Sequence, residues 1–199
     1  MTTLADIRSR TRTDLHDGDA PQRWTDDELD RHIAHALGEL SLAMPRELTA
    51  TIATTPGSRE LSVATLTALV EVHRVEYPVA DFPPCLVRFT QWGETILLDL
   101  STAPDGSDAT VDYTAGHTLD DAGSSLPPRF EELLVMGASA YAVLEQSVAT
   151  IDGLNTGGPA VPEQFAASAR ARLTAFGQLL QQYARANRVR SRRLVTPAF

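Results

Sequence analysis

The segment Arg23-Trp24-Thr25-Asp26-Asp27-Glu28-Leu29 decides the fold at the N-terminal end of this chain. Thr25 stands where the N-cap of a helix belongs, and Glu28 follows three residues later, as a capping box requires. The two aspartates between them complement the positive end of the helix dipole. Trp24, just before the cap, is a hydrophobic staple. The segment therefore predicts a helix that begins at a tryptophan-anchored elbow.

A first helix precedes this elbow and ends at the break Asp17-Gly18-Asp19. Three- and four-residue spacing predicts one packed face on it, made by Leu4, Ile7, Thr11 and Leu15. Its other side chains are expected to remain in water, namely Arg8, Arg10, Arg12 and Asp14. The second helix turns Leu29, Ile33, Leu37 and Leu40 inward. It ends at Pro45, because proline cannot supply the next backbone donor.

From residue 46 to about residue 120 the apolar residues alternate, which predicts β structure. A turn at Thr55-Pro56-Gly57-Ser58 predicts a hairpin between strands at 52–55 and 61–66. A change of phase between Val72 and Val75 predicts a β-bulge near His73 or Arg74. Residues 91–94 predict a turn between two further strands, and Asp105-Gly106 predicts the last hairpin.

Helical periodicity returns after Leu126-Pro127-Pro128, and a last helix is predicted to begin near Val161. Small residues at 137–140 allow a close helix neighbour. The predicted fold class is α+β: a four-helix bundle of two N-terminal and two C-terminal helices, with an inserted antiparallel β region and a basic C-terminal tail. The predicted domains are the helical bundle at 1–45 and 126–187, the β-rich insertion at 46–125, and a flexible tail at 188–199.

This order of elements and the opening residues resemble the head-to-tail connector, or adaptor, proteins of tailed bacteriophages. Those proteins often begin with a helix of the type L-x-x-I-x-x-R, a loop, and an R-W-[ST]-D-x-E-L helix. A cap and staple alone would explain the same residues locally. The matching residues here are Leu4, Ile7, Arg8, Arg23, Trp24, Thr25, Asp26, Glu28, Leu29, Ile33 and Ala36.

The resemblance implies a structural virion neck protein that docks on the portal, forms a ring of commonly twelve copies, and extends the DNA channel to the tail. It implies no catalytic site and no cofactor. The partners would be the portal protein, a downstream tail or stopper protein, and further copies of this chain. The large β insertion looks more like the adaptors of short-tailed phages. Assembly would take place in the host cytoplasm.

The distribution of charge along the chain predicts a protein that does not bind DNA stably. The formal net charge is -9, and all 17 basic residues are arginine. Residues 1–184 carry 12 arginines against 26 acids, whereas residues 185–199 carry five arginines and no acid. Stable binding to phosphate needs clustered cations, so genomic DNA is expected only as a non-specific passing ligand.

The C-terminal tail is the predicted portal-binding element, because its cations and terminal aromatic suit an acidic groove. A solvated terminus is the alternative. The predicted portal-binding residues are Arg185, Arg188, Arg190, Arg192, Arg193 and Phe199.

The residues that usually carry chemistry form no convincing site in this sequence. His32 and His35 lie on adjacent turns without a third metal ligand at a defined spacing, so no metal site is predicted. Neither a serine elbow nor a phosphate loop is present. The acidic pairs at Asp26-Asp27 and Glu131-Glu132 suit helix N-termini. We therefore expect no enzyme.

The single cysteine, Cys85, is expected to be a buried small hydrophobe that forms no internal disulfide. No apolar run has the length of a membrane span and no secretory leader is recognisable, so we expect a soluble intracellular product without membrane contact. Two alternatives to the adaptor remain. One is another tail-completion or stopper component, and the other is a DNA-binding regulatory protein, which the two N-terminal helices and the arginine-rich tail suggest.

Overall fold

The computed structural model describes residues 2–79, 82–151 and 161–187. Its two compact units are Met1–Met44 with His117–Phe199, here the helical unit, and Pro45–Gly116, here the β unit. The helices are α1 (Leu4–Asp14), α2 (Asp26–Ala43), the 3-10 helix η1 (Pro128–Phe130), α3 (Glu131–Ile151) and α4 (Val161–Asn187). The strands are β1 (Arg46–Ala53), β2 (Glu60–Ser62), β3 (Leu69–Glu76), β4 (Leu86–Val87), β5 (Phe89–Trp92), β6 (Thr95–Leu98) and β7 (Asp108–Ala115).

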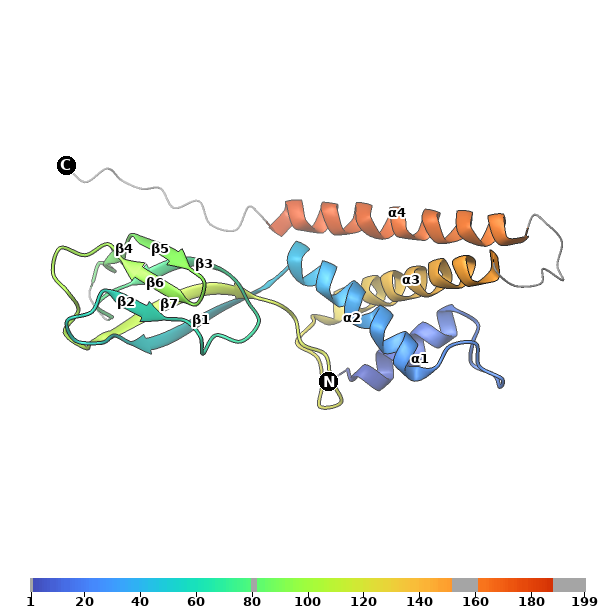
Figure 1. The fold of residues 1–199 in the computed structure, drawn as a ribbon, viewed down its shortest axis with the longest axis horizontal. Helices are drawn as coiled ribbons and strands as arrows, with labels where there is room; N and C mark the ends of the chain where they lie inside the picture. Colours follow the sequence, from blue (N-terminus) through green and yellow to red (C-terminus); the bar gives the residue numbers. More distant parts are fainter. Residues whose placement is uncertain (1, 80–81, 152–160, 188–199) are drawn as a thin grey trace. The chain divides into compact units, whose positions relative to one another are not determined.

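The helical unit is organised around α3, which packs against α1, α2 and α4 (Figure 1). Proline residues before and within η1 lead the chain into this helix, where the missing N–H costs no helical hydrogen bond. Each N-terminal helix begins with a capping box, formed by Thr3 with Asp6 on α1 and by Thr25 with Glu28 on α2. These local signals therefore fix where the helices start.

The α+β assignment fits the structure, but the predicted four-helix bundle is wrong. Among the described residues the strands number seven and form two antiparallel sheets, so the β part is a second unit with a hydrophobic cluster of its own. In the helical unit α1 has only 11 residues, roughly 16 Å of helix, and packs on α2 and α3. Amphipathic faces in the sequence indicate that helices pack, but they do not reveal that the strands form two sheets around a hydrophobic cluster of their own.

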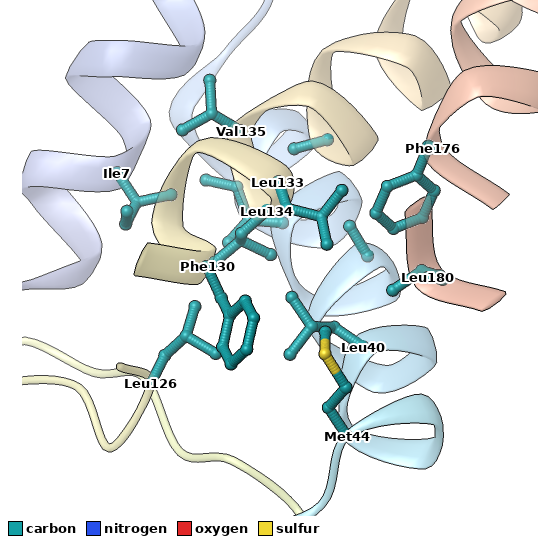
Figure 2. Packing of buried hydrophobic residues seen from close by; sticks show 13 residues of the cluster. Ile7, Leu40, Met44, Leu126, Phe130, Leu133, Leu134, Val135, Phe176 and Leu180 are labelled. Atoms are coloured by element: carbon teal, nitrogen blue, oxygen red, sulfur yellow. The ribbon is translucent and has the colours of Figure 1, made fainter. Parts of the chain in front are cut away.

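Three helices approach one another closely at Gly137 of α3. A Cβ atom built at this glycine would lie 2.7 Å from the ring of Phe176 on α4 and 3.0 Å from Cβ of Ala36 on α2. Figure 2 shows Phe176 and Leu180 directed from α4 toward the side chains of α2 and α3. Phe176 is almost completely buried. The small residue at 137 thus lets three helices meet at one point.

The β unit is a sandwich of a four-stranded sheet, in the order β1-β7-β3-β4, and a three-stranded sheet, in the order β2-β6-β5. One hydrophobic cluster draws residues from both sheets, including Val75 and Val111 of the first and Ile96 and Leu98 of the second. The sheets therefore pack face to face. The cluster of the helical unit has no residue in common with this one.

Two of the predicted β features are confirmed. The pairing of β3 with β7 shifts register between Val72 and Arg74, which places a bulge at His73. Strands β5 and β6 form a hairpin whose turn contains Gly93 at φ +58°.

Two predicted hairpins are wrong. The turn at Thr55–Ser58 exists, since the Ser58 N–H donates to the Thr55 carbonyl at 3.0 Å, but it leads the chain from one sheet into the other. Strand β1 pairs with β7 along eight residues, whereas β2 pairs with β6. The loop with Asp105-Gly106 likewise joins strands of different sheets. Turn-forming residues predict where the chain changes direction. They do not predict which strands pair, because a strand can form more hydrogen bonds with a distant strand than with the next one in sequence.

The chain leaves the helical unit after Met44 and returns to it at His117. The backbone N–H of His117 donates to Oγ of Ser41 at 2.9 Å, and its Nε2 lies 2.9 Å from the carbonyl oxygen of Met44. The two ends of the β segment therefore start from adjacent points on the helical unit.

Replacing Gly137 with alanine tests the three-helix contact. We expect Gly137→Ala to lower the free energy of unfolding by about 1–3 kcal/mol, because a buried ring must move to admit the methyl group. Gly38→Ala on α2 and Gly177→Ala on α4 are matched controls, since nothing lies within 4 Å of the added atom. Each control should gain up to about 1 kcal/mol from helix propensity. If urea denaturation shows that Gly137→Ala has the same effect on the free energy of unfolding as the two controls, the close contact is contradicted.

Removing the β unit tests the predicted division into domains. We expect that replacing residues 46–115 with a short glycine linker leaves a soluble helical protein, because the ends to be joined lie close together and the cores are separate. Circular dichroism and thermal unfolding measure the result. A deletion protein without cooperative unfolding would show that the helical unit needs the strands in order to fold.

Candidate functional site

The predicted portal-binding residues lie at the C-terminal end of the chain. Arg185 is on the last turn of α4 and is exposed. The others lie outside the described residues, namely Arg188, Arg190, Arg192, Arg193 and Phe199. Their grouping into one binding element therefore stays a prediction.

The elbow between α1 and α2 is held by several polar contacts. The N–H of Glu28 donates to Oγ1 of Thr25 at 3.3 Å, and the N–H of Thr25 donates to Oε2 of Glu28 at 2.7 Å. Trp24 packs with Leu15 of the elbow, Leu29 of α2 and Ala142 of α3 in one buried cluster. The cap and the staple thus fix the start of α2 and hold it against α3.

Arg12 makes the central interaction of the elbow, although the sequence predicts it to be in water. That prediction is wrong: its side chain is 10% exposed, and that of its partner Asp17 is 2% exposed. Arg12 Nη1 donates to Asp17 Oδ2 at 2.7 Å, and Nη2 donates to Asp26 Oδ1 at 2.6 Å. Asp17 also accepts the backbone N–H of Arg23 at 2.7 Å. A buried ion pair therefore closes the loop onto both helices.

Arg8 forms a second clamp one helical turn earlier. Its Nε and Nη2 donate to the two carboxylate oxygens of Asp30 at 2.8 and 2.6 Å, and Nη1 reaches Asp26 at 3.1 Å. The hydrogen bond to Asp30 raises the pKa of Arg8, and the bond from Arg12 lowers the pKa of Asp26. The spacing of Arg8 from Arg12 matches that of Asp26 from Asp30, so two adjacent turns of α1 bind two adjacent turns of α2.

A third arginine ties α1 to the start of α3. Arg10 donates to Glu131 and to Glu132, each at 2.6 Å. Oε1 of Glu131 accepts a further hydrogen bond from Thr2. The acidic pair that the sequence assigns to the helix dipole is thus also the anchor of α1. The partner could not be read from the sequence, because it lies more than 120 residues away.

His32 and His35 take structural positions between α2 and α3. The Nε2 of His32 is 3.0 Å from Glu145 but makes no hydrogen bond in the described part of the chain. Burial lowers the pKa of His32, against an opposing contribution from the charge of Glu145. His35 stacks on Tyr141 with ring centroids 4.2 Å apart. Across residues 2–79, 82–151 and 161–187 no cluster of ligand-type side chains is arranged to hold a metal ion.

Cys85 is exposed, so the prediction that it is buried is wrong. Its backbone carbonyl accepts the N–H of Tyr77 at 3.0 Å, which keeps the main chain beside β3 while the side chain lies outside the core. The local sequence offers no alternation there from which burial could be judged.

The sequence also gives no sign of three large apolar side chains that the β unit exposes. Phe82 is 96% exposed, Trp92 is 88% exposed and Leu97 is 51% exposed. Trp92 and Leu97 belong to the same hairpin. Within the described residues no helix is long and apolar enough to cross a membrane.

Comparison with known proteins gives one family match. The model of the family described as SU10 adaptor protein matches residues 2–196. No curated protein matches the chain. The family match covers nearly the whole chain and confirms the resemblance to phage head-to-tail adaptors.

The buried pair of the elbow leads to a stability prediction. Arg12→Met should lower the free energy of unfolding by about 3–5 kcal/mol, because Asp17 is left charged and buried without a cation. The double variant Arg12→Met/Asp17→Asn should lose less than the single one, since the stranded charge is gone. Arg172→Met breaks an exposed pair with Asp14 and serves as the control, with a loss below about 1 kcal/mol. Equal losses for Arg12→Met and Arg172→Met would refute the elbow's importance.

Proposed function

Since this chain belongs to the SU10 adaptor protein family, we propose that it is a structural neck protein of a tailed phage that docks on the portal, assembles as a ring and extends the DNA channel toward the tail. Adaptor membership implies a place at the virion neck, with portal and tail components as neighbours. The family match over residues 2–196 is the observation that carries the proposal.

The helical unit supports this proposal as a rigid support for docking. Three arginines of α1 hold this helix in place: Arg8 binds α2, Arg10 binds α3 and Arg12 binds the elbow. The residues of the R-W-T-D-D-E-L segment contribute a cap, a buried staple and a carboxylate to this network. A part that must keep its shape while DNA passes under pressure benefits from such cross-links.

Charge supports a channel through which DNA moves freely. The β unit carries four arginines against ten acids, and the whole chain has a net charge of -9. An acidic wall repels the phosphate backbone, so the genome slides instead of adhering. In this proposal the protein has no catalytic step and needs no cofactor.

The C-terminal tail is the proposed portal-binding element. Arg185 occupies an exposed position on the last turn of α4, and four further arginines follow it without any acid. Bidentate arginine–carboxylate pairs are strong when they are desolvated in a groove. With five arginines and no acid, the tail has a charge that is complementary to an acidic partner.

Co-sedimentation with purified portal particles tests both the function and the tail. Truncation after Ala184, or joint replacement of Arg190, Arg192 and Arg193 with glutamine, should weaken binding about 100-fold or more. Arg170→Gln on α4 removes an exposed cation outside the tail and should leave binding unchanged. Undiminished binding of the truncated chain would move the contact to the helices. If the full chain does not bind portal particles, the adaptor function is contradicted and a stopper or tail-completion role is favoured.

A further inference from the structure

The outer face of the three-stranded sheet presents two large apolar side chains with acids around them. Leu97 of β6 is paired with Glu60 of β2 and with Thr90 of β5, so these three side chains share one face. Trp92 lies two residues from Thr90 along β5 and is therefore on the same face. Glu94 lies in the turn of this hairpin, two residues after Trp92. We call Trp92, Leu97, Glu60 and Glu94 the hairpin patch.

The hairpin patch has the composition of a docking surface with an acidic rim. An exposed tryptophan is the side chain most enriched among residues that dominate binding energy. Neither Glu60 nor Glu94 has a salt-bridge partner in the part of the chain that the structure describes. Two copies of this patch would repel each other through their carboxylates, so its partner must be a different surface that carries a cation.

The helical unit carries such a surface where η1 meets the end of α4. The guanidinium carbon of Arg129 lies 4.7 Å from the centroid of the Phe130 ring, and Tyr183 meets that ring edge-on at 5.2 Å. Arg129 is exposed and has no carboxylate partner among the described residues, and Tyr183 is 37% exposed. The guanidinium lies over the ring of Phe130, and because Arg129 is exposed among the described residues, its opposite face could accept a second aromatic ring. We call Arg129, Phe130 and Tyr183 the arginine patch.

We propose that the hairpin patch of one copy docks on the arginine patch of a second copy, with Trp92 stacked on Arg129 and the carboxylates of Glu60 and Glu94 close to its charge. The two surfaces match in charge and in aromatic character, and both occur on every copy. A contact between two different patches is heterologous, and repetition of it closes into a ring when the rotation between copies allows. The inference rests on the proposed ring-forming function and names the surfaces that join its subunits.

Sedimentation velocity from about 1 µM to about 1 mM tests the contact in the free protein. We expect self-association at the upper end, weakened about tenfold or more by Trp92→Ala. Phe82→Ala removes an equally exposed aromatic outside the patch and should have no effect. A protein that stays monomeric at the highest concentration, or one that Trp92→Ala leaves unchanged, overturns the proposal.

Charge reversal identifies the partner surface. Glu60→Arg and Arg129→Glu should each weaken self-association, whereas an equal mixture of the two variants should associate more strongly than either variant alone. In the mixture one contact joins an unchanged hairpin patch to an unchanged arginine patch, and the other brings the two reversed charges opposite each other. Glu71→Arg, on the other sheet, is the control for net charge. If the mixture associates no more strongly than either variant alone, the proposal is overturned.

Portal co-sedimentation separates this inference from the proposed function. Trp92→Ala and Glu60→Arg should keep portal binding while self-association is weakened. If Trp92→Ala loses portal binding but keeps self-association, the hairpin patch belongs to the portal interface and the proposal is overturned. If the unchanged protein self-associates as described yet never binds portal, the adaptor function fails while the subunit contact stands.

Discussion

The buried pair between Arg12 and Asp17 is the constraint on which the helical unit depends. A guanidinium removed from water needs its charge matched and its donors used, and the elbow meets both needs with two carboxylates and a fixed loop. Because Asp17 also accepts the backbone N–H of Arg23, it ties the loop back just before Trp24, which packs in a cluster with Ala142 of α3. The direction of α2, and with it the point from which the β segment leaves, follows from this pair.

Helix α3 contacts α1, α2 and α4 through different kinds of interaction at different positions along its length. Its acidic start binds Arg10, its small residue at 137 admits Phe176, and Ala142 lies under Trp24. Polar anchoring sets the position of α1, while steric fit sets the distance of α4. The β unit has a core of its own, so its surface can change without disturbing these contacts. This separation suits a protein whose helices provide stability and whose strands provide further contact area.

Local signals in the sequence predicted local structure well. The Thr25 capping box, the bulge at His73 and the turn before Thr95 all depend on residues within a few positions of one another. The failures concern distant partners. The burial of Arg12 depends on how the elbow folds back, and the pairing of β1 depends on a strand more than 50 residues away. Exposed Trp92 was missed for the same reason, since alternation gives the face of a strand but not what covers it.

Hydrogen exchange of the isolated protein tests the central claim that the elbow and α3 form one cooperative unit. The account predicts that amides at the end of α1 and the start of α2 exchange as slowly as those around Ala138 of α3, through global unfolding alone. Their exchange should also speed up together when denaturant is added. Elbow amides that exchange much faster than the α3 amides, and that do not respond to denaturant, would show that the elbow opens by itself and would contradict the account.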